Sequence, residues 1–499
     1  MGAALRIAVI VLPTIVVWEL IRWFAWRKLR ERWQRSIGEW MRRHDVHLEH
    51  FRFIDRVWVR QTLLQDPDLD RAAADRAHDL GETVGQVRAR MEQWLDEIVP
   101  VFNLFSYYKL GGGVATTAVR LVYELVFDRD GLDAARRAVP AGAVTVYVAN
   151  HRSNADYVVL SVGAMKQVAL SYAVGEWARV WPLDALFRSF GSYLIRRGER
   201  DPLYHRVLSR YLQLVAGRGL TTAFFLEGAL SRDGGFRVPK IGLLDYVVGV
   251  LEADPEREIV FIPVGINFDR VLEDRNLVRE TADAPPPRAL DKARSFFGML
   301  RAAPRMLLGL FGPAWLAAHR RYGYASVQFG AAIPVRSLMP DAAEVARLPR
   351  KARFARMARL ADQLLDAVAA VVPATPVSLV CRALVAGEAD VPGVRRHVRE
   401  EIAELRGAGR RIAAGRAFAS IRRARKNAAD THAELDDHIV DAEEAERVVD
   451  LALSLLRRRR LVTTREGRVL VAERDWPLVR YYARSLDAPK LRAADGPGG

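Results

Sequence analysis

The sequence predicts an α/β fold: a mixed central sheet flanked by helices, with a helical region before this domain and a mostly helical region after it. Short apolar runs rich in β-branched residues at 144–150, 220–228 and 258–266 predict strands. Helical stretches at 156–168 and 202–217 separate these runs. Strands that alternate with helices form sheets covered on both faces, and their polar C-terminal edge usually holds the ligands.

The length of 499 residues exceeds what one ordinary core organises, so several regions are expected. Before the α/β domain, apolar residues recur at alternating threes and fours over 70–99, which predicts a helix. The expected boundaries are an anchor or interfacial helix over 1–35, a helical region over 36–110, the α/β domain over 111–375 and a mostly helical region over 376–499.

The N-terminus reads as a membrane anchor. The apolar run from Ile7 to Trp18 is 12 residues long, whereas a full span needs about 20. Tryptophans and then a run of basic residues follow it, as at a cytoplasmic flank that meets anionic lipid. We therefore expect a segment that either spans the membrane or lies on it, and the alternative is a buried helix. A second basic, apolar stretch over 294–322 fits a membrane interface or a core helix pair equally well.

The composition is that of a globular protein with an anionic partner. Half of the residues are apolar, and 76 basic residues against 60 acidic ones give a net charge of +16. This excess suits nucleic acid, an anionic membrane, or phosphorylated and CoA-like substrates. Cys381 is the single cysteine, so no intramolecular disulfide can form, and a reducing compartment fits.

A polar stretch, "NHRSNAD", follows the strand at 144–150 and contains the first candidate site. His151 precedes a predicted helix, and Asp156 lies in its first turn. A carboxylate that accepts from one ring nitrogen leaves the other nitrogen as a base. The plainer interpretation is a loop hydrogen bond, with Asn150, Ser153 or Asn154 capping the helix.

Three further stretches place cationic and small residues after apolar runs. The plain interpretation of these stretches is a solvated arginine pair, a turn and a surface lysine, respectively. The functional interpretation is a ligand site, because arginine binds phosphate oxygens and glycine lets the backbone approach a ligand closely. The residues singled out are Arg196 and Arg197 in "GSYLIRRGE", Glu227, Gly228, Ser231 and Arg232 in "FFLEGALSRDG", and Lys240 in "RVPKIGLL".

Together and in this order, "NHRSNAD", "GSYLIRR", "FLEGALSRDG" and "VFIPVGI" resemble the four motifs of the glycerolipid acyltransferases. The resemblance is greatest to the PlsB-type glycerol-3-phosphate acyltransferases and their dihydroxyacetone-phosphate relatives, and it covers roughly 110–390. The fourth motif centres on Pro263. One departure concerns Leu230, which stands where the third motif carries an arginine, although Arg232 is retained.

The resemblance implies acyl transfer from acyl-CoA or acyl carrier protein to the sn-1 hydroxyl of glycerol-3-phosphate, which makes lysophosphatidic acid. His151 would act as general base and Asp156 would orient it, without a covalent enzyme intermediate. The cations of the middle motifs would hold the acceptor's phosphate, while Glu227 would hold a glycerol hydroxyl or position an arginine. Backbone amides near Gly228 are candidate donors to the oxyanion. No metal and no cofactor are implied.

The expected location is the cytoplasmic face of a bacterial-type cell membrane, where an anionic surface is a partner. Leu230 keeps other acceptors open: lysophosphatidic acid, another lysolipid or dihydroxyacetone phosphate. A basic nucleic-acid-binding protein is the alternative from another class. Because the chain has no recognisable nucleic-acid module and no basic face interleaved with aromatic residues, no nucleic-acid partner is expected.

Overall fold

The structure is a computed structural model. It describes residues 56–100, 115–164, 167–168, 170–175, 188, 191–196, 198–281, 322–413 and 442–489. The predicted anchor at 1–35, nearly all of the basic apolar stretch at 294–322 and the candidate site residue Arg197 lie outside the described residues. Within those ranges, no helix has the length and apolar character needed to cross a membrane.

Three helices precede the sheet: α2 (Arg56–Leu64), α3 (Pro67–Leu80) and α4 (Val84–Ile98). The single helix predicted over 70–99 is therefore two. Gly81 adopts a left-handed conformation, with φ of 64°, and ends α3. Thr83 and Gln86 then form a capping box that begins α4. The apolar periodicity resumes in phase after this break, which is why the pattern alone did not reveal it.

The central sheet has eight strands, and the predicted mixed sheet with flanking helices is confirmed. Its order is β1-β7-β6-β2-β5-β3-β4, and β8 pairs with β6. Only β6 forms antiparallel pairs among these, with β7 and β8. The strands are β1 (Glu124–Phe127), β2 (Val144–Ala149), β3 (Ser171–Val174), β4 (Tyr193–Leu194), β5 (Thr222–Phe225), β6 (Ile259–Phe268), β7 (Tyr324–Phe329) and β8 (Ile333–Pro334).

The middle of the sheet is the core of the domain. Strand β2 lies parallel between β5 and β6, with Val148 opposite both Phe224 and Pro263. All ten residues of β6 are buried. Continuous burial explains the uninterrupted apolar runs from which these strands were predicted. The parallel arrangement also places the C-terminal ends of β2 and β5, and the polar stretches that follow them, at one edge of the sheet.

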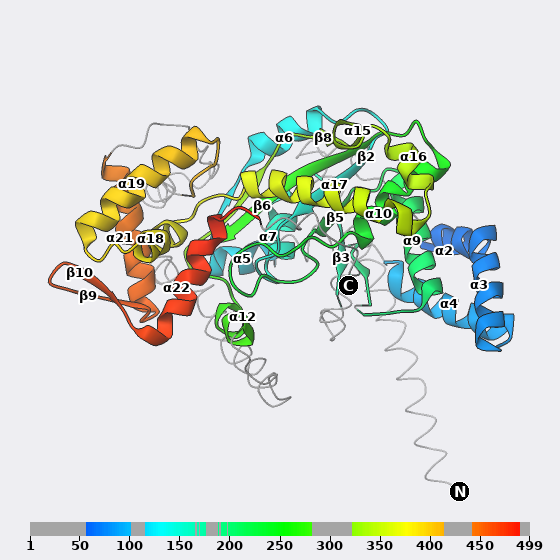
Figure 1. Ribbon diagram of the computed structural model, residues 1–499, viewed down its shortest axis with the longest axis horizontal. Helices are drawn as coiled ribbons and strands as arrows, with labels where there is room; N and C mark the ends of the chain where they lie inside the picture. The colour runs from blue at the N-terminus through cyan, green and yellow to red at the C-terminus, as the bar shows by residue number, and fades with distance from the viewer. Residues whose placement is uncertain are drawn as a thin grey trace, which may run out of the picture.

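Helices surround this sheet, and Figure 1 shows the longest of them, α17, running across it. Helix α9 begins where Asp201 caps it and Pro202 occupies its first turn, which is a standard helix start. The helices of the domain are α5 (Thr116–Val122), α6 (Arg129–Arg137), α7 (Asp156–Ala164), α9 (Pro202–Gly217), α10 (Gly242–Val248), α11 (Val250–Ala253), α12 (Asp274–Thr281), α15 (Val335–Leu338), α16 (Ala342–Arg347) and α17 (Arg350–Ala370).

The C-terminal region lies at the opposite end of the molecule from α2–α4 (Figure 1). Residues 462–465 and 468–471 form an antiparallel hairpin that turns at Glu466 and Gly467, which both have positive φ. The elements here are α18 (Pro376–Val385), α19 (Val391–Gly407), α21 (Ala442–Arg458), β9 (Val462–Arg465), β10 (Arg468–Val471), η4 (Glu473–Asp475), α22 (Trp476–Ala483) and η5 (Arg484–Leu486).

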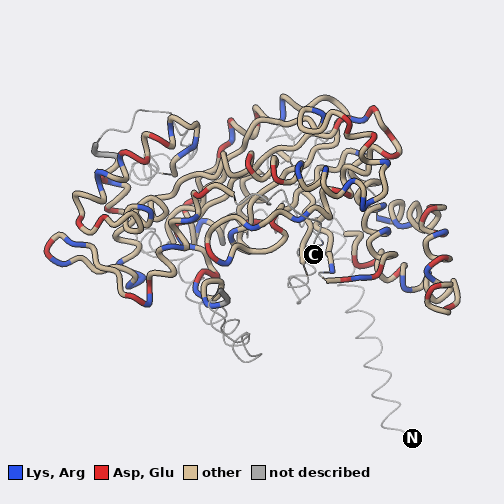
Figure 2. The backbone as a smooth tube through the Cα atoms, in the orientation of Figure 1, with Lys and Arg blue, Asp and Glu red and all other residues tan. Residues whose placement is uncertain are grey.

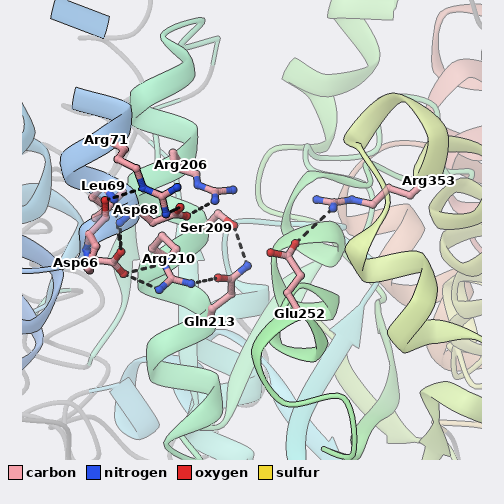
Figure 3. A network of polar contacts seen from close by, with 11 residues as sticks. Asp66, Asp68, Leu69, Arg71, Arg206, Ser209, Arg210, Gln213, Glu252 and Arg353 are labelled. Carbon is pink, nitrogen blue, oxygen red and sulfur yellow. Dashed lines mark hydrogen bonds and ion pairs between the residues drawn. The ribbon is translucent and has the colours of Figure 1, made fainter. Parts of the chain in front are cut away.

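Ion pairs connect the N-terminal helices to the α/β domain. Arg210 of α9 lies 2.6 Å from the carboxylate of Asp66, which also caps α3, and Arg206 pairs with Asp68 (Figure 3). Along the described chain, Lys and Arg alternate with Asp and Glu over every region (Figure 2). Both pairs are partly exposed, and surface ion pairs contribute about 0–1 kcal/mol each, so we expect these to orient α3 against α9 more than they stabilise the fold.

Candidate active site

The loop after β2 is tied to β6 by an asparagine. The side chain of Asn150 donates to the carbonyl of Ile266 at 2.8 Å and accepts from its amide at 2.8 Å. These two bonds complete the backbone pairing of β6 at the point where β2 ends. They hold the beginning of the "NHRSNAD" loop in a fixed position against the sheet.

Three donors converge on one carboxylate oxygen in this loop. Oδ2 of Asp156 accepts from Nδ1 of His151 at 2.9 Å, from the amide of Arg152 at 2.7 Å and from the amide of Ser153 at 3.0 Å. Asp156 is fully buried, and its Oδ1 has no hydrogen-bond partner among the described residues. With Nδ1 donating to the carboxylate, Nε2 is the ring nitrogen left to accept a proton.

Aromatic side chains hold the plane of the imidazole. The ring of Phe225 at the end of β5 stacks on His151, with centroids 4.0 Å apart, and Tyr157 meets it edge-on at 5.5 Å. The side chain of His151 is only 2% exposed. Because the ring is fixed by packing and by Asp156, it cannot turn to exchange its two nitrogens without disrupting the core.

Glu227 joins the first motif to the third. One carboxylate oxygen accepts from the amide of His151 at 2.9 Å, and the other accepts from the amide of Arg237 at 2.8 Å. Burial raises the pKa of Glu227 to about 7, although Arg152 and the two amides oppose this shift. Both oxygens therefore bind backbone, and Glu227 acts as a brace of the loop that carries His151, which we call the catalytic loop after its candidate role.

The remaining residues of the third motif shape its turn. Gly228 has a φ of 64°, and a Cβ there would lie 2.9 Å from Cγ of Lys240. The Gly228 amide donates to the carbonyl of Phe225 at 3.0 Å, so this amide is already engaged and is not a free donor to an oxyanion. The amide of Ser231 donates to the carbonyl of His151 at 3.1 Å, and its hydroxyl donates to the carbonyl of Gly235.

The predicted cationic residues do not form one cluster. Arg196 forms a forked ion pair with Glu97 of α4, at 2.7 and 3.0 Å, and this hydrogen bonding raises its pKa. Arg232 is exposed on the third motif, Lys240 is exposed in the stretch that follows it, and Arg197 lies outside the described residues. Pro263 is buried in β6, beside β2. The structure thus unites His151 and Asp156 with Glu227 and Ser231, but it directs Arg196 toward the N-terminal helices.

The sequence did not predict that Arg152 would be buried and would bind the backbone of distant segments. Its guanidinium donates to the carbonyl of Gly234 in the third motif and, at 2.8 Å, to the carbonyl of Ser485 near the C-terminus. Beside it, Arg484 pairs with Asp233 at 2.7 Å. The C-terminal segment therefore packs on the catalytic loops. No periodicity in the sequence around Ser485 points to this contact.

Glu273 is a second residue that sequence reasoning missed. Its carboxylate accepts from the hydroxyl of Ser153 at 2.8 Å and from the amide of Asn154 at 3.3 Å. Burial raises its pKa, and the nearby charge of Asp156 acts in the same direction. Within the described residues, no group of three or more His, Cys, Asp or Glu side chains could hold a metal ion.

Comparison with known proteins relates this geometry to a family. The family model described as Acyltransferase matches residues 134–267. A glycerol-3-phosphate acyltransferase of Actinobacillus succinogenes is 31% identical over 225 residues, which are 44% of this chain and 27% of that protein. The corresponding protein of Histophilus somni is 32% identical over 227 residues, 44% of this chain and 28% of that one. The chain thus matches little more than a quarter of the length of these relatives.

One solved structure is also similar, the 1-acyl-sn-glycerophosphate (LPA) acyltransferase PlsC from Thermotoga maritima. It is 15% identical, and the match covers 52% of this chain and 80% of that chain with a TM-score of 0.28, which is too low to carry an argument. The family model spans the whole interval from before His151 to the end of the fourth motif. The motif order, this match and the curated relatives agree. Residues 134–267 therefore form an acyltransferase domain, and the curated proteins to which this part of the chain is similar are glycerol-3-phosphate acyltransferases.

Proposed function

We propose that this chain is a glycerol-3-phosphate 1-O-acyltransferase. It would move an acyl group from acyl-CoA, or from acyl carrier protein, to the sn-1 hydroxyl and release lysophosphatidic acid. The observation that carries this proposal is the 2.9 Å contact between Nδ1 of His151 and Oδ2 of Asp156, inside the region that matches the acyltransferase family. The names of the curated relatives support glycerol-3-phosphate as the acceptor.

In this reaction Nε2 of His151 takes the proton from the acceptor's hydroxyl while the oxygen attacks the thioester carbonyl. Asp156 stabilises the imidazolium that forms, and it stays ionised. The tetrahedral oxyanion collapses with cleavage of the C–S bond, and the imidazolium returns the proton to the leaving thiolate. The products are the acylated acceptor and the free thiol, and no bond to the enzyme forms.

Entry of the substrates requires the site to open, because the His151 side chain is almost fully buried. Closure around the reacting groups would then exclude water, and water would otherwise hydrolyse the thioester. Arg232 on the third motif and Lys240 after it are exposed, and they would meet the acceptor's phosphate as it enters. Arg196 would bind the phosphate only if its guanidinium left Glu97. Arg197 is proposed as a phosphate ligand on the resemblance alone.

The membrane is the proposed location, on its cytoplasmic face. The tryptophan-rich and arginine-flanked N-terminal sequence supports this, since aromatic and basic residues favour the interface with anionic lipid. An apolar acyl donor and a lysophospholipid product also partition into a bilayer. No metal and no cofactor takes part in the proposed chemistry.

A different phosphorylated acceptor is the second candidate, and Leu230 favours it. This residue stands where the third motif of the family carries an arginine. The guanidinium of Arg237 donates to the carbonyl of Leu230 at 3.3 Å, so a cation is present nearby but at another place on the loop. Lysophosphatidic acid, another lysolipid or dihydroxyacetone phosphate would be the acceptor in that case.

An acceptor panel tests the proposal. Purified full-length protein receives radiolabelled acyl-CoA with each candidate acceptor in turn, and His151→Ala serves as the inactive control. Removal of a general base lowers kcat by about 10²–10⁴-fold. Labelled lysophosphatidic acid from glycerol-3-phosphate, absent with the variant, is the expected result. Transfer to another acceptor alone selects the second candidate. Activity of the variant within threefold of wild type would reject His151 as the base.

A further inference from the structure

An arginine-lined cavity lies near Glu273, which accepts a hydrogen bond from the loop that carries His151. It has a volume of about 410 Å³ and lies among the end of β6, the first turn of α12 and the end of α21. Its guanidinium groups come from two distant parts of the chain. We call it the arginine cavity after the residues Arg270, Arg275, Arg458, Arg459 and Arg460 that line it.

Three of these arginines have no carboxylate partner among the described residues. Arg459 pairs with Asp274, but no described carboxylate pairs with Arg270, Arg275 or Arg460. Asp269 is the one acidic residue among the described residues that line the cavity. Its two oxygens accept from the amides of Tyr324 and Val377, at 2.8 and 2.9 Å, and burial raises its pKa to about 7. Asp269 is therefore turned to the backbone and is only partly ionised near neutral pH, so the cavity keeps a strong positive field.

Two of the arginines are held in place for binding. The guanidinium of Arg270 stacks on the ring of Tyr322, with 3.7 Å between its central carbon and the ring centroid. Arg460 has a φ of 59°, a conformation that glycine adopts readily and arginine does not. It occupies the position after α21 where glycine commonly ends a helix. An arginine makes this backbone conformation less favourable than a glycine would, and its side chain lines the cavity.

The cavity adjoins the catalytic loop through one short segment. Asp274 pairs with Arg459 in the cavity wall, while the preceding residue, Glu273, accepts from Ser153 of the catalytic loop. The motif cations Arg196, Arg232 and Lys240 do not line the cavity. It is therefore distinct from the acceptor site proposed above.

We propose that the arginine cavity binds the phosphate group of a ligand, which is either the headgroup of an anionic phospholipid or a soluble phosphorylated compound. Arginine suits this group because its planar fork of N–H donors matches two phosphate oxygens. Several convergent guanidinium groups with one partly neutral carboxylate favour a doubly charged phosphate over a carboxylate or chloride.

The test compares two double variants with equal change in charge. R275Q/R460G removes two arginines from the cavity, and R279Q/R457Q removes two from the same α12 and α21 segments without touching the lining. Glycine at 460 also relieves the left-handed conformation, so the first variant is expected to melt no lower than the control. The acceptor-site residues are unchanged in both, so a difference in binding between the two variants reports on the cavity.

Calorimetric titration of the full chain uses inorganic phosphate as one probe and dihexanoyl phosphatidic acid as the other. R275Q/R460G is expected to bind at least one probe about tenfold more weakly than R279Q/R457Q, because two charge-assisted contacts are lost at a partly exposed site. If only the affinity for phosphatidic acid falls, the ligand of the cavity is a lipid headgroup. If the affinity for both probes falls equally, the cavity recognises the phosphate group itself. If both variants bind both probes within twofold of each other, the proposal is wrong. The single variant R275Q, expected to lose about threefold, repeats the test without a change in the backbone.

Discussion

Replacing Asp156 with asparagine separates the charge of this residue from its role in the loop. Oδ2 of Asp156 accepts all three of its hydrogen bonds, while its Oδ1 has no hydrogen-bond partner among the described residues. The oxygen of asparagine can take the position of Oδ2 and accept the same three bonds. Its amide nitrogen then replaces the unpartnered oxygen. We therefore expect Asp156→Asn to keep the loop geometry and the orientation of His151.

The variant is expected to lose the attraction between the imidazolium of His151 and the carboxylate of Asp156 in the transition state. An imidazolium and a carboxylate about 4 Å apart attract each other by about 4 kcal/mol at an effective dielectric constant of about 20. Since about 1.36 kcal/mol corresponds to tenfold in rate, kcat is expected to fall by up to about 10³-fold. KM for both substrates should change little, because Asp156 is assigned no contact with either one. Steady-state kinetics with radiolabelled acyl-CoA, each substrate varied in turn, measures these values.

Glu273→Gln is the matched control for this experiment. Glu273 also accepts from the catalytic loop, through Ser153 and Asn154, but it has no contact with the imidazole. Its replacement should lower kcat by less than about tenfold, and melting curves should be similar for both variants. If Asp156→Asn stayed within threefold of wild type, or if both variants lost equal activity, the carboxylate of Asp156 would be a loop brace and no more.

Three further predictions concern the membrane, the phosphate and pH. Deletion of 1–35 should move part of the protein from membranes to the soluble fraction, and complete pelleting of the truncated chain would contradict this. Arg232→Ala should raise KM for the acceptor about tenfold to hundredfold and leave KM for the acyl donor unchanged. Arg232→Lys should restore the acceptor KM only in part. An equal increase in both KM values would contradict phosphate binding by Arg232. The free energy of unfolding should fall by up to about 3 kcal/mol as the pH rises from about 4.5 to 8. The cause is the raised pKa of Glu227, because over this range the native state holds a proton that the unfolded state has released. Glu227→Gln should remove the part of this slope that Glu227 contributes in denaturant titrations, and the part that the raised pKa of Asp269 contributes with the same sign should remain.

The sequence by itself determined the local parts of this protein. Runs of β-branched residues located β2, β5 and β6, because strands buried on both faces require continuous apolar sequence. The spacing from His151 to Asp156 was equally informative, since six residues of loop and first helical turn suffice to bring a carboxylate to an imidazole. The short strands β1 and β3 were missed, because four residues carry too little periodicity to be told from helix or loop.

Tertiary structure alone decided which distant side chains complete the site. Glu227 reaches the amide of His151 across 76 residues, and Arg152 reaches the carbonyl of Ser485 across 333. Arg196 looked like a phosphate ligand in the sequence, yet the fold brings Glu97 to its guanidinium. Such contacts depend on how elements pack, and packing between remote segments leaves no periodic trace in either one. The sequence could therefore predict the pairing of His151 with Asp156. The contacts of Glu227 around this pair and the arginine cavity became visible only in the folded chain.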